Sequence, residues 1–172
     1  MLKKFSLYLI ALLLSACSVS SYIPFVNKEK AVIALDKTAI DQKSYAVAYE
    51  TTVQSYSDRV GQDYDVNSFT SGVNDWYLGR ILVPIEQIKQ NLNQGMNDNN
   101  VYAYYSGVVF AADLQANFSR LSATCWDNID RPSMTQGIYD AMRDLQKNKV
   151  RSENDEFLTQ GSEQLLQVCQ AK

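Results

Sequence analysis

Helical periodicity runs through almost all of this 172-residue chain and restricts its fold more than any other feature. One apolar stripe consists of Tyr45, Tyr49, Tyr56 and Val60, at spacings of four, seven and four residues. This spacing predicts a helix from about residue 41 to residue 60, with Gly61 as its stop. Strand-like alternation is confined to the short run from Val32 to Leu35, which fits a helix equally well.

Two further helices are predicted before residue 95. The first carries the apolar positions Phe69, Val73, Trp76 or Tyr77, and Leu78. Asn67 or Ser68 is expected to cap its N-terminus, because short polar side chains accept hydrogen bonds from free helix N–H groups. Gly79 and Pro84 then interrupt the periodicity, and a shorter helix follows with Ile85, Ile88 and Leu92. The asparagine-rich end of residues 91–100 predicts a turn.

Three helices are predicted in the C-terminal part. The first covers about residues 101–124, and its small residues Gly107, Ala111 and Ala112 suit close contact with another helix. Pro132 is typical of the first turn of the next helix, which carries Ile138, Met142 and Leu145 on one face. The last helix is expected to begin at a capping box over 152–155 and to reach Cys169. Its predicted inward residues are Phe157, Leu158, Leu165 and Val168. The pattern predicts an all-α fold, a single compact domain of five to six helices.

The N-terminus has the three parts of a secretory signal peptide. Lys3 and Lys4 precede an apolar run over residues 5–14, and the small residues Ser15 and Ala16 follow. The apolar run is about ten residues long, whereas a helix that spans a bilayer needs about 20. A cleaved or processed leader is therefore favoured over a permanent transmembrane helix.

Leu14-Ser15-Ala16-Cys17 resembles the lipobox of bacterial lipoproteins. The resemblance implies a diacylglycerol on the Cys17 sulfur and an acyl chain on its amine, so the membrane is one expected partner. Ser18 stands where an Asp favours inner-membrane retention, which implies an outer-membrane address with the domain facing the periplasm. The predicted division is a signal peptide over 1–16, a lipidated N-terminus and short tether over 17–26, and a helical domain over 27–172.

Lipidation of Cys17 would leave two of the three cysteines, Cys125 and Cys169. In the oxidising compartment that an exported lipoprotein enters, an even pair is expected to form a disulfide. Two buried free thiols are the alternative. The bond would bring the end of the helix over 101–124 next to the end of the last helix.

Charge and composition exclude several functions. Removal of Lys3 and Lys4 with the leader leaves 14 basic and 19 acidic residues, a net charge of −5. This balance, with no basic stripe, argues against binding of nucleic acid. The chain has no histidine, which excludes Ser-His-Asp triads and histidine metal sites. No catalytic residue, metal site or cofactor is predicted. Asp63-Tyr64-Asp65 is only a fragment of a calcium loop.

Carboxylates are the remaining candidates for catalysis. A peptidoglycan-modifying enzyme would need a buried glutamate as general acid, and Glu50 and Glu86 have apolar or aromatic neighbours in the sequence. Lytic transglycosylases begin their motif with a Glu-Ser pair. In this chain Glu50 precedes Thr51 and Glu86 precedes Gln87, so that resemblance fails.

Aromatic residues favour a binding function instead. Tyr102, Tyr104 and Tyr105 are crowded at the start of one helix, so at least one of them must point away from the core, and exposed tyrosines are common in interfaces. The layout from Tyr102 to Cys169 also resembles helical periplasmic immunity proteins that neutralise type VI secretion effectors. The sequence therefore predicts a non-catalytic binding or accessory lipoprotein with a protein partner. An immunity or inhibitor lipoprotein is the alternative, and a cell-wall enzyme is the second alternative.

Overall fold

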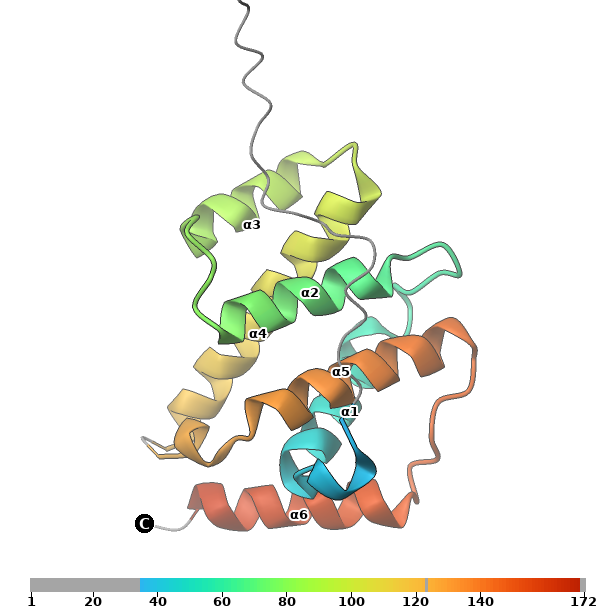
Figure 1. Cartoon of the computed structure of the whole chain (residues 1–172), viewed down its shortest axis with the longest axis vertical. Helices are drawn as coiled ribbons and strands as arrows, with labels where there is room; N and C mark the ends of the chain where they lie inside the picture. The colour runs from blue at the N-terminus through green and yellow to red at the C-terminus, as the bar shows by residue number, and fades with distance from the viewer. Residues whose placement is uncertain (1–34, 123, 171–172) are drawn as a thin grey trace, which may run out of the picture.

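Six α-helices and two short 3-10 helices make up the part of the chain that the structure describes, residues 35–122 and 124–170. In order they are η1 (Lys37–Ala39), α1 (Gln42–Tyr56), α2 (Val66–Tyr77), α3 (Ile85–Gln94), α4 (Asn99–Leu121), η2 (Trp126–Asn128), α5 (Arg131–Gln146) and α6 (Glu156–Gln170). The computed structural model has no strand within these ranges, which confirms the all-α prediction (Figure 1). None of the described helices is both long and apolar enough to cross a membrane.

An aspartate precedes five of the six α-helices and caps each N-terminus. The caps are Asp41, Asp65, Asp98, Asp130 and Asp155. Each carboxylate accepts a hydrogen bond from a backbone N–H two or three residues later, which satisfies a donor that the helix leaves free. The negative charge also opposes the positive end of the helix dipole. Helix α3 begins after Pro84, which provides no side-chain cap.

These caps correct two predicted helix starts. Helix α2 begins at Val66 behind Asp65, so neither Asn67 nor Ser68 is its cap. Helix α6 begins at Glu156 behind Asp155, so the predicted capping box led by Ser152 is wrong. The Ser152 hydroxyl instead accepts a hydrogen bond from the Asn154 N–H in the turn before the helix. In both cases a carboxylate, which interacts favourably with the helix dipole, occupies the cap position.

Other predicted boundaries and burial assignments also change. Helix α1 ends at Tyr56, four residues before the predicted end, and α4 ends at Leu121 rather than at residue 124. Leu78 is the C-cap of α2 and is exposed. Phe157 was expected to face inward, yet it is 40% exposed because it lies in the first turn of α6 at the edge of the domain. Its ring still packs edge-on against Tyr45, with ring centroids 5.8 Å apart.

Helices α2 and α4 run parallel and touch through their backbones. Tyr64, just before α2, lies near Ser106 in the early part of α4, and Trp76, near the end of α2, donates a hydrogen bond to Gln115 farther along α4. A Cβ atom on Gly107 would lie 2.0 Å from the Phe69 carbonyl oxygen, and one on Gly72 would lie 2.0 Å from the Tyr104 oxygen. Only glycine permits such an approach, because any side chain at these two positions would overlap the facing backbone. The predicted small-residue face around Gly107 is therefore confirmed as a close helix contact. Helix α3 packs on α4, where Ile88 lies in one cluster with Tyr104 and Val108.

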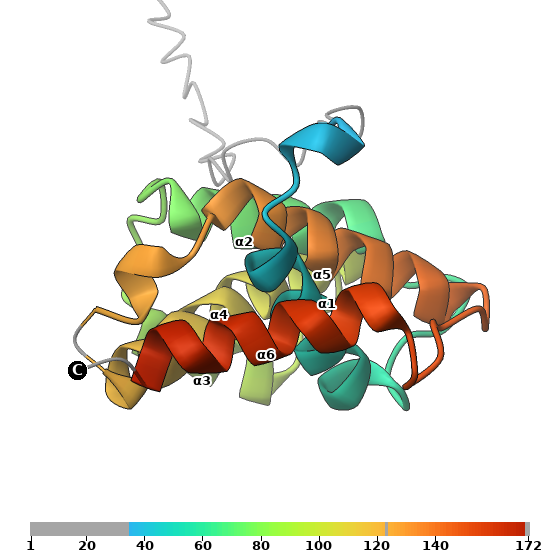
Figure 2. The same ribbon diagram turned by 90° about the horizontal axis from the view of Figure 1, so that it is seen from below.

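Helices α1 and α5 run parallel, and α6 packs mainly on α1. The Cys125–Cys169 disulfide, with Cα atoms 4.6 Å apart, joins the segment after α4 to the end of α6. This pairing confirms the predicted disulfide. Figure 1 shows the C-terminal end of α6 beside that segment, and Figure 2 shows η1 on one side of the molecule with α6 below it. The disulfide therefore links α6, which packs on α1, to the segment that follows α4.

Candidate functional site

Two tyrosines of α1 donate hydrogen bonds to two aspartates of α5. The Tyr45 hydroxyl lies 2.7 Å from Asp140 Oδ2, and the Tyr49 hydroxyl lies 2.8 Å from Asp144 Oδ2. Arg151, in the loop after α5, lies over both rings, with its guanidinium carbon 5.5 and 5.3 Å from the two ring centroids. Its backbone N–H donates to the Tyr49 hydroxyl. The four polar side chains on the two helices are thus held by one another and by Arg151.

Burial and these aspartates raise the pKa of both tyrosines. For Tyr45, burial is the largest cause, and the hydrogen bond to Asp140 adds to it, so its pKa lies far above the usual range. Burial and the hydrogen bond to Asp144 raise the pKa of Tyr49 to about 12, against the lowering effect of Arg151. Both hydroxyls therefore remain protonated at neutral pH and serve as hydrogen-bond donors, which is a structural role.

The N-termini of α1 and α5 cap each other. The Asp41 N–H donates to the Ser133 hydroxyl at 2.8 Å, and the Asp130 N–H donates to the Ser44 hydroxyl at 2.9 Å. Both serines are fully buried. Asp41 and Asp130 each begin an Asp-x-x-Ser sequence, and their carboxylates accept from the N–H of their own helix. The Asp-x-x-Ser pattern also occurs at residues 65–68, and nothing local indicated that the copies at 41–44 and 130–133 exchange hydrogen bonds.

The carboxylates considered for catalysis do not form a buried acid. Glu50 and Glu86 are both exposed, and Glu50 accepts a hydrogen bond from the Ser162 hydroxyl at 2.6 Å. Asp65, part of the calcium-loop fragment, uses both carboxylate oxygens for the backbone and side chain of Ser68. Within residues 35–122 and 124–170, no group of three or more metal-ligating side chains comes together.

The three tyrosines considered for an interface differ in their surroundings. Tyr102 is 43% exposed, Tyr105 is half-buried, and Tyr104 is buried. The Tyr104 hydroxyl donates to Asp75 of α2 at 3.0 Å, which explains its burial and removes it from the candidate surface. Tyr105 packs with Ile88 and Val108 between α3 and α4. Of the three tyrosines, exposed Tyr102 therefore remains the main candidate for an interface, and half-buried Tyr105 is a weaker one.

Tyr102 lies close enough to Tyr56 and Tyr64 to affect their pKa values, and Arg59 lies over the Tyr56 ring. These four residues are called here the Tyr102 patch. The exposed Arg59 has its guanidinium carbon 6.0 Å from the centroid of the Tyr56 ring. The Tyr64 hydroxyl is buried and, among the described residues, has no hydrogen-bond partner of good geometry. Burial is the main cause that raises the pKa of Tyr56 and of Tyr64, and their neighbouring hydroxyls add to it.

The patch rests on an aromatic cluster at the junction of α1, α2 and α4. Tyr56 packs edge-on against Phe69 and Phe110, with ring centroids 5.1 and 5.2 Å apart. Sequence reasoning placed Tyr56 in the core and did not identify Arg59 or Tyr64. The spacing of Arg59 three residues after Tyr56 was a weak signal, because α1 ends between them and the loop brings the side chains together.

Cys17 lies outside the described residues, as do residues 27–34 of the predicted domain. A family model described as "Uncharacterised lipoprotein" matches residues 38–171. The chain is also similar to an uncharacterized protein of Haemophilus influenzae, with 57% identity over 176 residues that cover 100% of this chain and 99% of the relative. No solved structure matches the chain. With a match across nearly the whole described domain, the chain belongs to this family of uncharacterised lipoproteins.

Proposed function

We propose that this lipoprotein is a non-catalytic binding module, held in the bacterial outer membrane by lipid on Cys17 and facing the periplasm. Membership of a lipoprotein family supports the anchor, and the Leu-Ser-Ala-Cys sequence provides the residue. Ser18 supports the outer-membrane address. The bound partner is a protein, and the domain contacts it through the Tyr102 patch.

The Tyr102 patch is the observation that carries the proposed binding function. Exposed tyrosine and arginine side chains over a well-packed base are enriched among residues that dominate binding energy. The patch has this composition, because Tyr102 and Arg59 are exposed and Tyr56, under Arg59, packs on the rings of Phe69 and Phe110. The rigid base limits the side-chain entropy that a partner must remove on binding.

The use of acidic groups supports a non-catalytic role. Five aspartates cap helices, and three others, Asp75, Asp140 and Asp144, accept hydrogen bonds from buried tyrosines. A general acid or base must instead reach a substrate proton and have a pKa suited to its transfer. These eight carboxylates are directed at the protein itself, so they stabilise the fold.

Photo-crosslinking from the patch tests the binding function. A benzoylphenylalanine at position 102 of the full membrane-anchored chain is expected to give one discrete cross-linked protein, whereas the same probe at exposed Asn117 of α4 gives none. The purified partner is then expected to bind the Arg59→Ala variant at least tenfold more weakly than the parent. Equal products from both positions, or unchanged affinity of Arg59→Ala, would contradict the proposal.

The identity of the partner separates two roles. A constitutive envelope protein supports an accessory module. A toxic effector, captured only in mixed culture with an attacking strain, supports the immunity lipoprotein, whose layout the C-terminal part resembles.

For the anchor, the mass of the mature N-terminal peptide is expected to show lipid on Cys17, and Cys17→Ser is expected to release the protein from membranes.

A further inference from the structure

The loop between α2 and α3, residues 78–84, exposes two leucines to solvent. Leu82 is 94% exposed and Leu78 is 53% exposed, and Leu82 has the largest exposed fraction of the large apolar side chains in the described chain. Exposing such a side chain to water is unfavourable in proportion to its apolar area. Transfer of this exposed leucine from water into an apolar phase would therefore lower its free energy.

The conformation of the loop is fixed on both sides of Leu82. Gly79 adopts the left-handed conformation with φ of 66°, and the Arg80 N–H bonds the Asp75 carbonyl, which closes the end of α2. Ile81 and Val83 are half-buried and pack on the cluster between α3 and α4. Their inward packing forces Leu82 outward. The loop thus presents this leucine constantly, at no cost in ordering when it meets another phase.

We propose that the α2–α3 loop inserts Leu82 into the interfacial region of the bilayer that carries the lipid anchor. The inference rests on the proposed anchor at Cys17. Between Cys17 and Leu35, the first described residue, the chain spans 18 residues, which reach at most about 60 Å. The loop is therefore within reach of the anchoring membrane, and the tether raises the effective concentration of the loop at the surface.

The point at which the described chain enters the domain is fixed. The Leu35 N–H donates to the Gln136 side chain on α5. Figure 1 shows the α2–α3 loop at one edge of the molecule, where no other described element covers it. The tether is long enough for this edge to meet the anchoring membrane.

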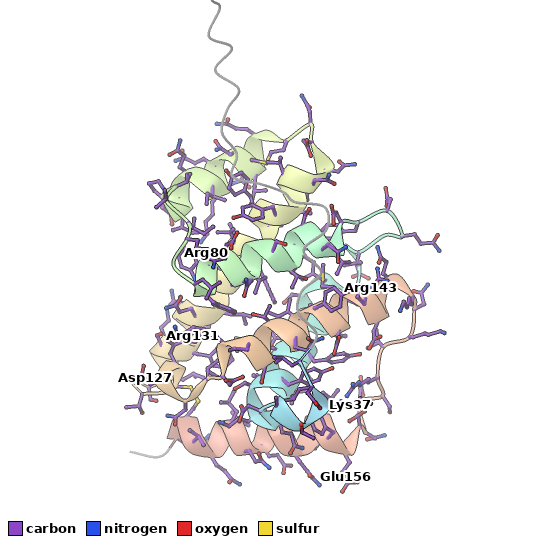
Figure 3. The ribbon with its side chains drawn as sticks, viewed as in Figure 1. Lys37, Arg80, Asp127, Arg131, Arg143 and Glu156 are labelled. Atoms are coloured by element: carbon purple, nitrogen blue, oxygen red, sulfur yellow. A yellow bond between two sulfur atoms is a disulfide. The ribbon has the colours of Figure 1, made fainter. Side chains whose placement is uncertain are left out.

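Two guanidinium groups lie on the edge that carries the loop. Figure 3 shows Arg80 at the end of α2 and Arg131 at the start of α5 along one edge, with Asp127 farther along it. Arg80 has a 63% exposed side chain and pairs with Asp75 at 3.3 Å. Arginines beside an inserted apolar residue pair with lipid phosphates, so Arg80 is positioned to limit the depth to which Leu82 enters.

The same orientation leaves the Tyr102 patch accessible. The patch lies where α2 begins and the loop lies where α2 ends, and a helix of 12 residues is about 18 Å long. With the loop at the bilayer, the patch stands away from the lipid surface. Membrane contact and partner binding therefore use opposite ends of α2 and do not compete.

Quenching by brominated lipid tests the insertion. The full lipidated chain with Leu82→Trp is reconstituted in vesicles of phosphatidylethanolamine and phosphatidylglycerol with bromine on the acyl chains. Its emission, corrected for Trp76 and Trp126 with the parent chain, is expected to fall by at least half. Leu166→Trp is the matched control, because Leu166 is a 54% exposed leucine on α6 and is expected to lose little emission. Both sites are exposed, so the variants should fold.

Equal or absent quenching at position 82, in protein that floats with the vesicles, would overturn the inference. If quenching is absent and a cross-linker at position 82 instead captures one envelope protein, the loop binds a protein and the lipid proposal is wrong. If the native chain fails to float, the anchor proposal fails separately. The quenching at positions 82 and 166 is then compared on the full chain bound through an N-terminal hexahistidine tag to nickel-chelating lipids. This comparison tests insertion of Leu82 independently of the lipid anchor.

Discussion

The α1–α5 pair is joined by polar groups, whereas the α2–α4 pair is joined by bare backbone and aromatic rings, although both pairs run parallel. Both pairs approach closely at a glycine, since a Cβ on Gly137 of α5 would lie 2.4 Å from the Tyr45 oxygen. In the α1–α5 pair the two N-termini meet, which places two positive dipole ends side by side. In the α2–α4 pair Tyr64, which precedes α2, lies near Tyr102 and Ser106 of α4, so the two N-termini are offset. All four helices have an aspartate cap, and the α1–α5 pair adds the exchanged serine caps.

The largest expected effect concerns the link between the two pairs. Helix α6 packs on α1 of the α1–α5 pair, and the disulfide joins it to the segment after α4. Removing both Cys125 and Cys169 by substitution with Ala should lower the free energy of unfolding by roughly 4 kcal/mol, because the bond closes a separation of 44 residues. Urea denaturation measures the loss. The oxidised Cys17→Ser chain is the control, and equal stability of both chains would mean that the bond does not constrain the unfolded state.

A methyl group at Gly107 should disrupt the contact between α2 and α4. Alanine in place of an interior helical glycine ordinarily stabilises a helix by about 1 kcal/mol. At Gly107 we expect the opposite sign, a loss of about 3 kcal/mol, because the facing Phe69 carbonyl cannot move without separating α2 from α4. The midpoint of urea denaturation reports the change. Ser119→Ala, on the exposed side of α4, should be nearly neutral, and a stabilised Gly107→Ala chain would refute the close contact.

The exchanged caps should distinguish the α1–α5 pair from a helix with a purely local cap. Ser44→Ala and Ser133→Ala each leave a partly buried N–H without its acceptor, so each should cost about 1–3 kcal/mol. Ser68→Ala in α2 removes only a hydroxyl that donates to Asp65, and its cost should stay below about 1 kcal/mol. Denaturation of the three variants checks this order. Equal losses at Ser44 and Ser68 would show that the exchange adds nothing.

The smallest effect is confined to alkaline solution and to the α1–α5 pair. Tyr49 has a folded pKa of about 12, above its unfolded value of about 10. Its neutral form therefore contributes stability that is fully present below pH 10 and is lost as pH rises toward 12. The Tyr49→Phe chain should lose less stability than the parent across this interval. Denaturation at several alkaline pH values, with tyrosinate absorbance, tests this, and identical pH profiles would contradict the assigned hydrogen bond.

Periodicity predicted the helices well because apolar spacing is a local property of the chain. Helix ends were less accurate. Serine and asparagine were favoured as caps at positions 67, 68 and 152, while the structure uses the aspartates at 65 and 155. Both residue types can cap, and only the carboxylate also complements the helix dipole. The recurrence of Asp before five helices was a usable signal.

Which helices pack against each other could not be predicted from local sequence patterns. Gly107 was correctly assigned to a close contact, but its partner Phe69 lies 38 positions earlier and is not marked by spacing. The serine exchange joins residues about 90 positions apart in two copies of one tetrapeptide. The Tyr102 patch was found in part, since Tyr102 was named and Arg59 was missed. Such contacts depend on how whole helices dock, which a single sequence does not encode locally.

The way in which the chain enters the domain determines how it would respond to mechanical force. Tension applied from the N-terminal side reaches Leu35 and its hydrogen bond to Gln136 first, and then the Asp41–Ser133 bond at the start of α1. These two hydrogen bonds, at either end of residues 35–40, would therefore break one after the other. Beyond Asp41 the load would fall on several bonds of the α1–α5 pair at once. A chain pulled from its N-terminal side would thus yield first over residues 35–40, with the helical domain intact.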